Sequence, residues 1–132
     1  VEAAVIEFAR GGLLKGGLKL DAIDVGVVLN VHDNHIGLDG VNSREDLARV
    51  KRLVAEAARH CVVLHADHAL CLAMREYAGA PVALVSRRHD NAELAAHRRG
   101  GGMGACVDAS GRALELFDRG AVVGRIDIAA IP

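Results

Sequence analysis

The stretch DVGVVLNVHDNHIG, from Asp24 to Gly37, decides how the chain is interpreted. Its first half is an almost unbroken run of valine and leucine, which is typical of a parallel strand covered by helices on both faces. We therefore expect a central strand over residues 24–31. The second half concentrates side chains that hydrogen-bond, titrate or bind metals: Asn30, His32, Asp33, Asn34 and His35. Ligands of open α/β sheets bind outside the carboxyl ends of the strands, so we expect a site here.

Composition excludes several classes of function. The 132 residues are 52% hydrophobic and only 2% aromatic, and their formal net charge is −1. Lys and Arg are dispersed, so no basic patch for nucleic acid or an anionic membrane is predicted. No apolar run approaches the roughly 20 residues that cross a bilayer, and the first residues lack the basic start of a signal peptide. We expect a cytoplasmic protein without nucleic-acid or membrane partners.

Strand-like and helix-like segments alternate over residues 1–90, which predicts βαβ units. Apolar runs predict strands at residues 1–9, 24–31, 61–64 and 82–85. Helical spacing predicts helices at 10–20, 44–59 and 69–77, and a helical turn at 91–97. Short runs split by glycine turns predict an antiparallel meander at 105–107, 113–117 and 121–126. The predicted fold class is α/β, a mostly parallel sheet with flanking helices and a C-terminal antiparallel β meander, forming one domain over 1–132.

Ser43 marks the start of the clearest helix. Asp46 follows three residues later, which is a capping-box pattern. Leu47, Lys51 and Val54 then fall at i, i+4 and i+7, so the lysine ammonium lies on the apolar stripe. Burial favours the neutral amine, the form that reacts with carbon dioxide. The alternative is a lysine that extends to the edge of the stripe.

Polar side chains follow three of the predicted strands. Glu7 follows the first, Asn30 to His35 follow the second, and His65 with Asp67 follow the third. The carboxyl ends of parallel strands share one edge of the sheet, so these side chains should converge. Glu7 and His35 together could bind a divalent metal through oxygen and nitrogen. A hydrogen-bonded Glu–His pair without metal is the alternative.

A second group of histidines and cysteines leaves a further alternative open. The three cysteines show no C-x-x-C spacing, which favours free thiols in a reducing compartment. Five residues nevertheless crowd together and allow a zinc site as a hypothesis: His60, Cys61, His65, His68 and Cys71. The competing interpretation is cysteines packed in a core and histidines at loop ends.

Several segments resemble the central ATPase domain of the Mur-type ligases. They are EFARGG at 7–12, DVGVVLNV at 24–31, HIG at 35–37, DLARVK at 46–51 and AD at 66–67. They follow the family's order and cover nearly the whole chain. The resemblance implies a P-loop-NTPase-like domain whose N-terminal part lies outside these residues. It also implies an enzyme that joins an amino acid to a carboxylate through an acyl phosphate, while ATP becomes ADP.

The resemblance carries specific roles over to this chain. Glu7 and His35 match the family's magnesium-binding residues, and Asn30 matches the asparagine that precedes this histidine. Lys51 matches a lysine that several members carry as a carbamate bridging to magnesium. The implied cofactors are ATP and Mg²⁺, and the implied partners are a nucleotide and an amino-acid or peptide substrate.

The chain also departs from the family. Asn34 stands where an aspartate is usual, and His65-Ala66-Asp67-His68 replaces an Asn-Ala-Asp-Asp segment that helps to hold adenosine. No G-x-x-x-x-G-K-[ST] phosphate loop occurs in the sequence. We therefore expect the phosphate-binding loop to lie outside these residues and the chain alone to be inactive. A non-catalytic α/β domain with a decayed nucleotide site is the alternative.

The two ends of the chain suggest a part of a larger protein. Val1 already belongs to an apolar run, and Ile131-Pro132 follows without a polar tail. We expect the strand at residues 1–9 to leave an apolar edge. Such an edge could pair with another copy and give a homo-oligomer.

Overall fold

The computed structural model describes residues 2–32, 37 and 40–131. The helices are α1 (Arg10–Gly16), α2 (Arg44–Glu56), α3 (Ala69–Leu72) and α4 (Ala92–Arg99), with 3₁₀ helices η1 (Ala73–Tyr77) and η2 (Ile128–Ala130). The strands are β1 (Ile23–Val28), β2 (Ala58–His65), β3 (Val82–Ser86), β4 (Met103–Val107), β5 (Ala113–Asp118) and β6 (Ala121–Asp127). They form one sheet in the order β1-β2-β3-β4-β5-β6. Strands β1 to β4 are parallel and β4 to β6 antiparallel, so the predicted α/β fold with a C-terminal meander is confirmed.

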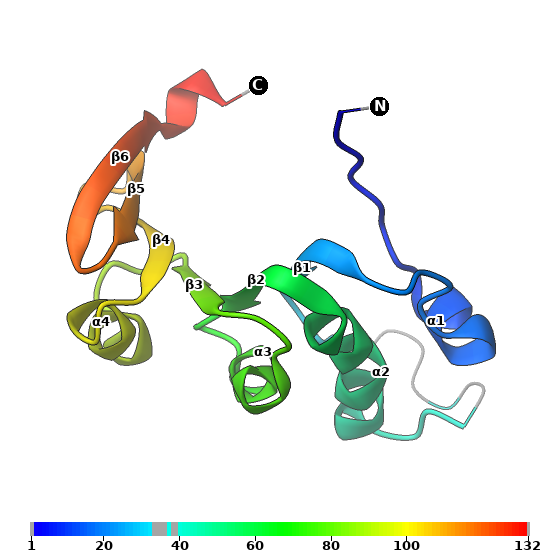
Figure 1. Ribbon diagram of the computed structural model, residues 1–132. Helices are drawn as coiled ribbons and strands as arrows, with labels where there is room; N and C mark the ends of the chain where they lie inside the picture. Colours follow the sequence, from blue (N-terminus) through cyan, green and yellow to red (C-terminus); the bar gives the residue numbers. More distant parts are fainter. Residues whose placement is uncertain (1, 33–36, 38–39, 132) are drawn as a thin grey trace.

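Strand β1 lies at the edge of the described sheet, so the prediction of a central strand covered on both faces is wrong. Helices α2, α3 and α4 all lie on one side of the sheet (Figure 1). The cause is the strand order, because right-handed crossovers between strands added in sequence place every helix on the same face. On the opposite face Val27 is 49% exposed, whereas its neighbour Val28 is buried beneath α2.

The segment before α1 is not a strand, contrary to the sequence-based prediction. Residues 2–9 have no regular secondary structure, and Val5 is fully exposed. Figure 1 shows this segment leading away from the sheet. A strand needs a neighbour that shares its hydrogen bonds, and the segment does not take up the edge of β1. Its apolar residues therefore reflect a propensity for strand structure, but the segment pairs with none of the strands of the described sheet.

Helix α2 begins as the capping pattern predicts. The Ser43 Oγ accepts the backbone N–H of Asp46 at 3.1 Å, and the Asp46 carboxylate accepts the N–H of Asn42 at 3.1 Å. The Asn42 amide, followed by the Ser43 hydroxyl, lowers the pKa of Asp46. The helix ends at Glu56, three residues before the predicted end, because β2 already begins at Ala58.

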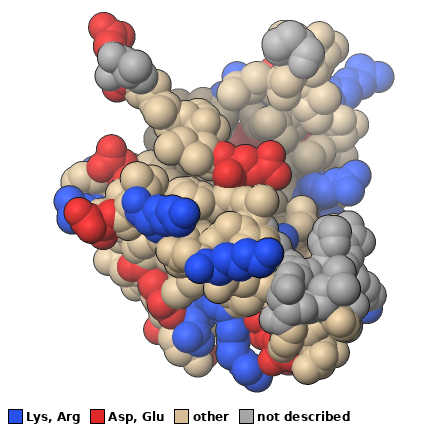
Figure 2. Space-filling view, turned by 90° about the vertical axis from the view of Figure 1, so that its right-hand side faces the viewer, with Lys and Arg blue, Asp and Glu red and all other residues tan. Residues whose placement is uncertain are grey.

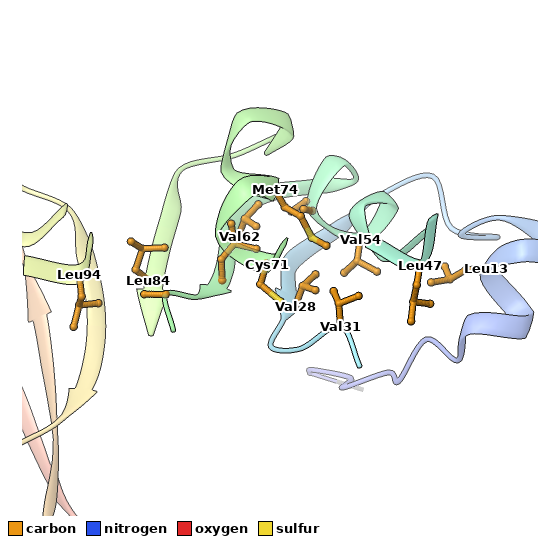
Figure 3. Close-up of a cluster of buried hydrophobic side chains, with 14 of the residues drawn as sticks. Leu13, Val28, Val31, Leu47, Val54, Val62, Cys71, Met74, Leu84 and Leu94 are labelled. Atoms are coloured by element: carbon orange, nitrogen blue, oxygen red, sulfur yellow. The ribbon is translucent and has the colours of Figure 1, made fainter. Parts of the chain in front are cut away.

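The core lies between the sheet and its helices. Figure 3 shows side chains from α1, α2 and α3 in one row with those of the strands, and its labelled members include Leu13, Val28, Leu47, Val54, Val62, Cys71 and Leu84. Burial of a valine or leucine side chain stabilises a fold by about 1.5–3 kcal/mol. This row therefore fixes α2 against β1 and β2, and with it the side chains that α2 carries to the edge of the sheet.

The charges on the surface are mixed. On the face shown in Figure 2, Lys and Arg alternate with Asp and Glu, and neither sign forms a continuous patch. This distribution agrees with the absence of a basic run in the sequence. Within the described residues, none of the helices has the length and apolarity that crossing a membrane requires.

Candidate functional site

The carboxyl ends of β1, β2 and β3 meet at one edge of the sheet. Strand β1 ends before Leu29 and Asn30, β2 ends at His65, and β3 ends at Ser86. Because the three strands are parallel, their last residues necessarily share this edge. Asn30, which follows β1, and His65, which ends β2, therefore lie at the same edge of the sheet, whereas residues 33–36 lie outside the described part of the chain.

Lys51 extends from α2 to the end of β1. Its Nζ lies 2.9 Å from the backbone oxygen of Asn30 and 3.2 Å from the Asn30 Oδ1. An ammonium group donates to both carbonyl oxygens at once. The side chain is partly buried and reaches the loop that follows β1. The contact joins the helix to the loop that carries the candidate ligands.

His65 connects the ends of β1 and β2. Its Nδ1 lies 2.8 Å from the backbone oxygen of Leu29, and its Nε2 lies 3.2 Å from the Asp67 Oδ2. The side chains of His65 and Asp67 are only 21% and 19% exposed. Both ring nitrogens thus face oxygen acceptors inside the protein, which leaves the flat faces of the ring for other contacts.

Asp67 is the centre of a hydrogen-bond network at the end of β3. Its Oδ1 accepts from the Ser86 Oγ at 2.7 Å and from the Asn91 Nδ2 at 2.7 Å, and its Oδ2 accepts from the Arg87 N–H at 2.8 Å. Burial opposes ionisation of this carboxyl, but the three hydrogen bonds and His65 together lower its pKa. Asp67 is therefore an ionised group that holds its neighbours in place.

Sequence reasoning missed Ser86 and Asn91. The same signal that identified His65 would have found Ser86, because it is the polar residue at the end of a buried strand. Asn91 is the N-cap of α4, where its Oδ1 accepts from the Leu94 N–H at 2.9 Å. The sequence indicates no second role for this cap residue, so the hydrogen bond from its amide nitrogen to Asp67 could not be predicted.

Glu7 does not follow a strand, so its predicted position at the end of one is wrong. It is exposed and lines a groove of about 1150 Å³ that runs along β1. Asn30 and Lys51 line the same groove. The other predicted metal ligand, His35, lies outside the described residues, as does Asn34. The expected approach of Glu7 to His35 therefore stays a prediction.

The zinc hypothesis gains no support from the described part of the chain. No group of three or more His, Cys, Asp or Glu side chains is placed there to hold a metal ion. Cys61, Cys71 and Cys106 are free, as the sequence suggested. Burial raises the pKa of Cys71 to about 11, against an opposing effect of the Lys51 charge, so this thiol stays protonated at neutral pH.

The groove offers a carboxylate that fits magnesium by its chemistry. The Glu7 carboxylate is a hard oxygen ligand of the kind that Mg²⁺ prefers, and it lines the groove. The Asn30 Oδ1 does not fit as a direct ligand in this arrangement, because it already accepts from the Lys51 ammonium. Asp67 does not fit as a direct ligand of a nucleotide, because both of its oxygens already accept hydrogen bonds inside the protein.

The fold defines an α/β domain whose parallel strands end in polar side chains at one edge, beside a groove along β1 that is lined mostly by apolar residues. No protein-family model matches the chain. The chain is similar to cyanophycin synthetases over 110 residues, which are 82% of its length. The identity is 48% with the protein from Crocosphaera subtropica, 43% with that from a Synechocystis species and 42% with that from Geminocystis herdmanii.

The matched region is a small part of these relatives. The chain spans about 13% of their length. The Glu-x-Ala-Arg-Gly-Gly form of residues 7–12 leads us to expect a protein that resembles cyanophycin synthetase most among the Mur-type ligases. The motif and the three relatives therefore indicate the same group of ligases.

Proposed function

We propose that this chain is part of an ATP-dependent, carboxylate–amine ligase similar to cyanophycin synthetase, with a Mur-type central domain. The enzyme would form an amide bond through an acyl phosphate and release ADP. The observation that carries the proposal is the contact of Lys51 with Asn30 at the carboxyl end of β1, beside a groove that Glu7 also lines. The similarity to cyanophycin synthetases supplies the reaction class.

In this proposal Glu7 and His35 hold Mg²⁺, which supplies positive charge to neutralise the phosphates. Lys51 orients Asn30 through its two hydrogen bonds. The family role of this lysine as a carbamate requires the neutral amine. An ammonium that donates to two carbonyl oxygens is protected from that reaction, so we expect carbamylation only when the side chain leaves Asn30.

Asn30, His65 and Asp67 form the proposed nucleotide side of the site. Both nitrogens of His65 are engaged, so the ring would meet an adenine base through its face, by stacking. Asp67 would act indirectly, by fixing His65 and the end of β3. The phosphates would be bound by a loop outside these residues, because the sequence contains no phosphate-loop motif.

The proposal also covers the cellular location and the binding partners of the enzyme. We infer a cytoplasmic ligase whose partners are a nucleotide and an amino-acid or peptide substrate. The exposed apolar residues of β1 make a homo-oligomer part of the same expectation. A non-catalytic domain with a decayed nucleotide site is the second candidate, favoured by the full engagement of the Asp67 carboxylate inside the protein.

Magnesium-dependent binding of a fluorescent ATP analogue separates the two candidates. The measurement uses a longer polypeptide that contains these residues together with a phosphate loop. Lys51→Met should weaken binding at least about tenfold, or about 1.4 kcal/mol. Lys15→Met, on the exposed surface of α1, should leave the affinity unchanged. A longer polypeptide that binds no nucleotide would favour the decayed site.

A further inference from the structure

Two histidines from the segment that ends β2 contact the backbone on both sides of Asn30. The His65 Nδ1 lies 2.8 Å from the oxygen of Leu29, and the His68 Nε2 lies 3.3 Å from the nitrogen of Val31. These contacts join positions 36 and 37 residues apart in the sequence. The backbone of Asn30 is thus held from its two neighbours while Lys51 contacts the residue itself.

The partner atoms determine the role of each ring. A carbonyl oxygen only accepts, so the His65 Nδ1 must carry a hydrogen and donate it to Leu29. A backbone N–H only donates, so the His68 Nε2 must be unprotonated to accept from Val31. His68 is therefore a neutral imidazole with its hydrogen on Nδ1. The two histidines have opposite roles, because His65 donates through Nδ1 whereas His68 accepts through Nε2. A His68 ring with its hydrogen on Nε2 would lose the contact with Val31.

The second nitrogens of the two rings lie in different environments. The His65 Nε2 is oriented by Asp67, which is itself fixed by Ser86 and Asn91. The His68 Nδ1 is buried without a hydrogen-bond partner in the described part of the chain. A buried donor without a partner destabilises a fold. His68 is positioned by its other nitrogen, which accepts from Val31, and by an edge-on contact with the His32 ring, whose centroid lies 5.9 Å away.

We propose that His65 and His68 form a two-histidine clamp that positions the backbone at residues 29–31 and thereby directs Asn30 toward Lys51 and the groove. The contacts of the clamp are made without a bound ligand. Only its role in positioning a nucleotide-binding residue rests on the proposed function. Both histidines are positioning residues. They stand where the Mur-type ligases usually carry Asn and Asp, so the clamp explains these departures as a different way of holding the strand end rather than as decay.

Side-chain nitrogen NMR of the ¹⁵N-labelled 132-residue chain tests the clamp directly. The expected result at neutral pH is a His68 ring with its hydrogen on Nδ1 and a Val31 amide that is protected from hydrogen exchange. A His68 ring with its hydrogen on Nε2 would overturn the proposal. This measurement needs no nucleotide, so its failure is distinct from failure of the proposed function.

Paired variants separate positioning from general stability. His68→Gln keeps an acceptor near the position of Nε2, whereas His68→Phe keeps a ring without an acceptor. His68→Phe should speed exchange of the Val31 amide at least about tenfold relative to the core amide of Val62, because only the local opening becomes easier. His68→Gln should restore protection. Equal exchange of Val31 in both variants would overturn the clamp.

Variants of His65 test the donor contact with Leu29 and its effect on nucleotide binding. His65→Asn keeps a donor near Nδ1 but removes the ring that would stack on a base, whereas His65→Phe keeps a flat ring and removes the donor to Leu29. In the longer polypeptide, His65→Phe should therefore reduce nucleotide affinity about tenfold through the lost positioning contact alone. Unchanged affinity in His65→Phe would overturn the positioning role. A clamp seen by NMR in a longer polypeptide that binds no nucleotide would contradict the proposed function alone.

Discussion

The Nζ of Lys51 lies 2.9 Å from the backbone oxygen of Asn30 and 3.2 Å from its Oδ1, although the two residues are 21 positions apart in the sequence. The contact joins α2 to the loop that follows β1. It therefore couples the packing of a helix against the sheet to the geometry of the candidate site.

Lys51→Met removes both hydrogen bonds while it keeps an apolar stem. We expect a loss of about 1 kcal/mol in the free energy of unfolding, since two partly solvated hydrogen bonds are replaced by contacts with water. Urea unfolding measures the change. Lys15→Met on the surface of α1 is the control and should stay within about 0.5 kcal/mol of the original chain. Equal stability of both variants would show that the Asn30 contact contributes nothing.

Ser43→Ala removes the N-cap of α2. The N–H of Asp46 then loses its acceptor, so the free energy of unfolding should fall by about 1 kcal/mol. Ser43→Asp provides another side-chain acceptor at the same position and should be close to the original chain. Thermal unfolding of the three proteins tests the order. An alanine variant as stable as the aspartate variant would exclude a role for the cap.

Gly26→Ala tests the contact between β1 and α2. A Cβ at this position would meet the backbone oxygen of Val54, which cannot move aside as a side chain could. We expect a loss of about 1–3 kcal/mol from overpacking. Gly12→Ala in α1 meets nothing within 4 Å and should instead gain about 0.5–1 kcal/mol from helix propensity. Stability changes of the same sign would contradict this packing.

Asp67→Asn should change how stability depends on pH. The folded-state pKa of Asp67 is lowered, so its carboxylate stabilises the fold above the unfolded pKa of about 4, and this contribution is lost as the pH falls through the folded-state pKa. The variant should be less stable by about 1 kcal/mol at pH 7 and should lose less stability below pH of about 4. Urea unfolding from pH 7 to 3 measures both effects, with exposed Asp21→Asn as the control.

Local patterns predicted the parts of this fold that depend on local physics. The Ser43 cap, the apolar run of β2 and the polar residues after β1 and β2 were all visible in the sequence. The same kind of pattern failed at residues 2–9, because an apolar run indicates propensity but not whether a neighbouring strand is there to pair with it. The edge position of β1 was hidden for a related reason, since its valines look alike at an edge and in the centre.

The candidate site was predictable in outline only. The residues at the strand ends could be named because parallel strands share an edge. The contacts of His65 and His68 with the backbone beside Asn30 could not, because each depends on the register between β1 and β2 rather than on spacing in the sequence. The His-Ala-Asp-His segment, which suggested a decayed site, thus supplies the structure with specific hydrogen bonds.

Release of ADP by a longer polypeptide that contains these residues and a phosphate loop tests the central proposal most directly. The account predicts Mg²⁺-dependent ADP release that requires both a carboxylate and an amine substrate. Glu7→Gln should reduce it at least about 100-fold, in line with the loss of an electrostatic contact at the phosphates. The 132-residue chain alone should release none. Mg²⁺-dependent ADP release by that chain alone, abolished by Glu7→Ala, would contradict the account.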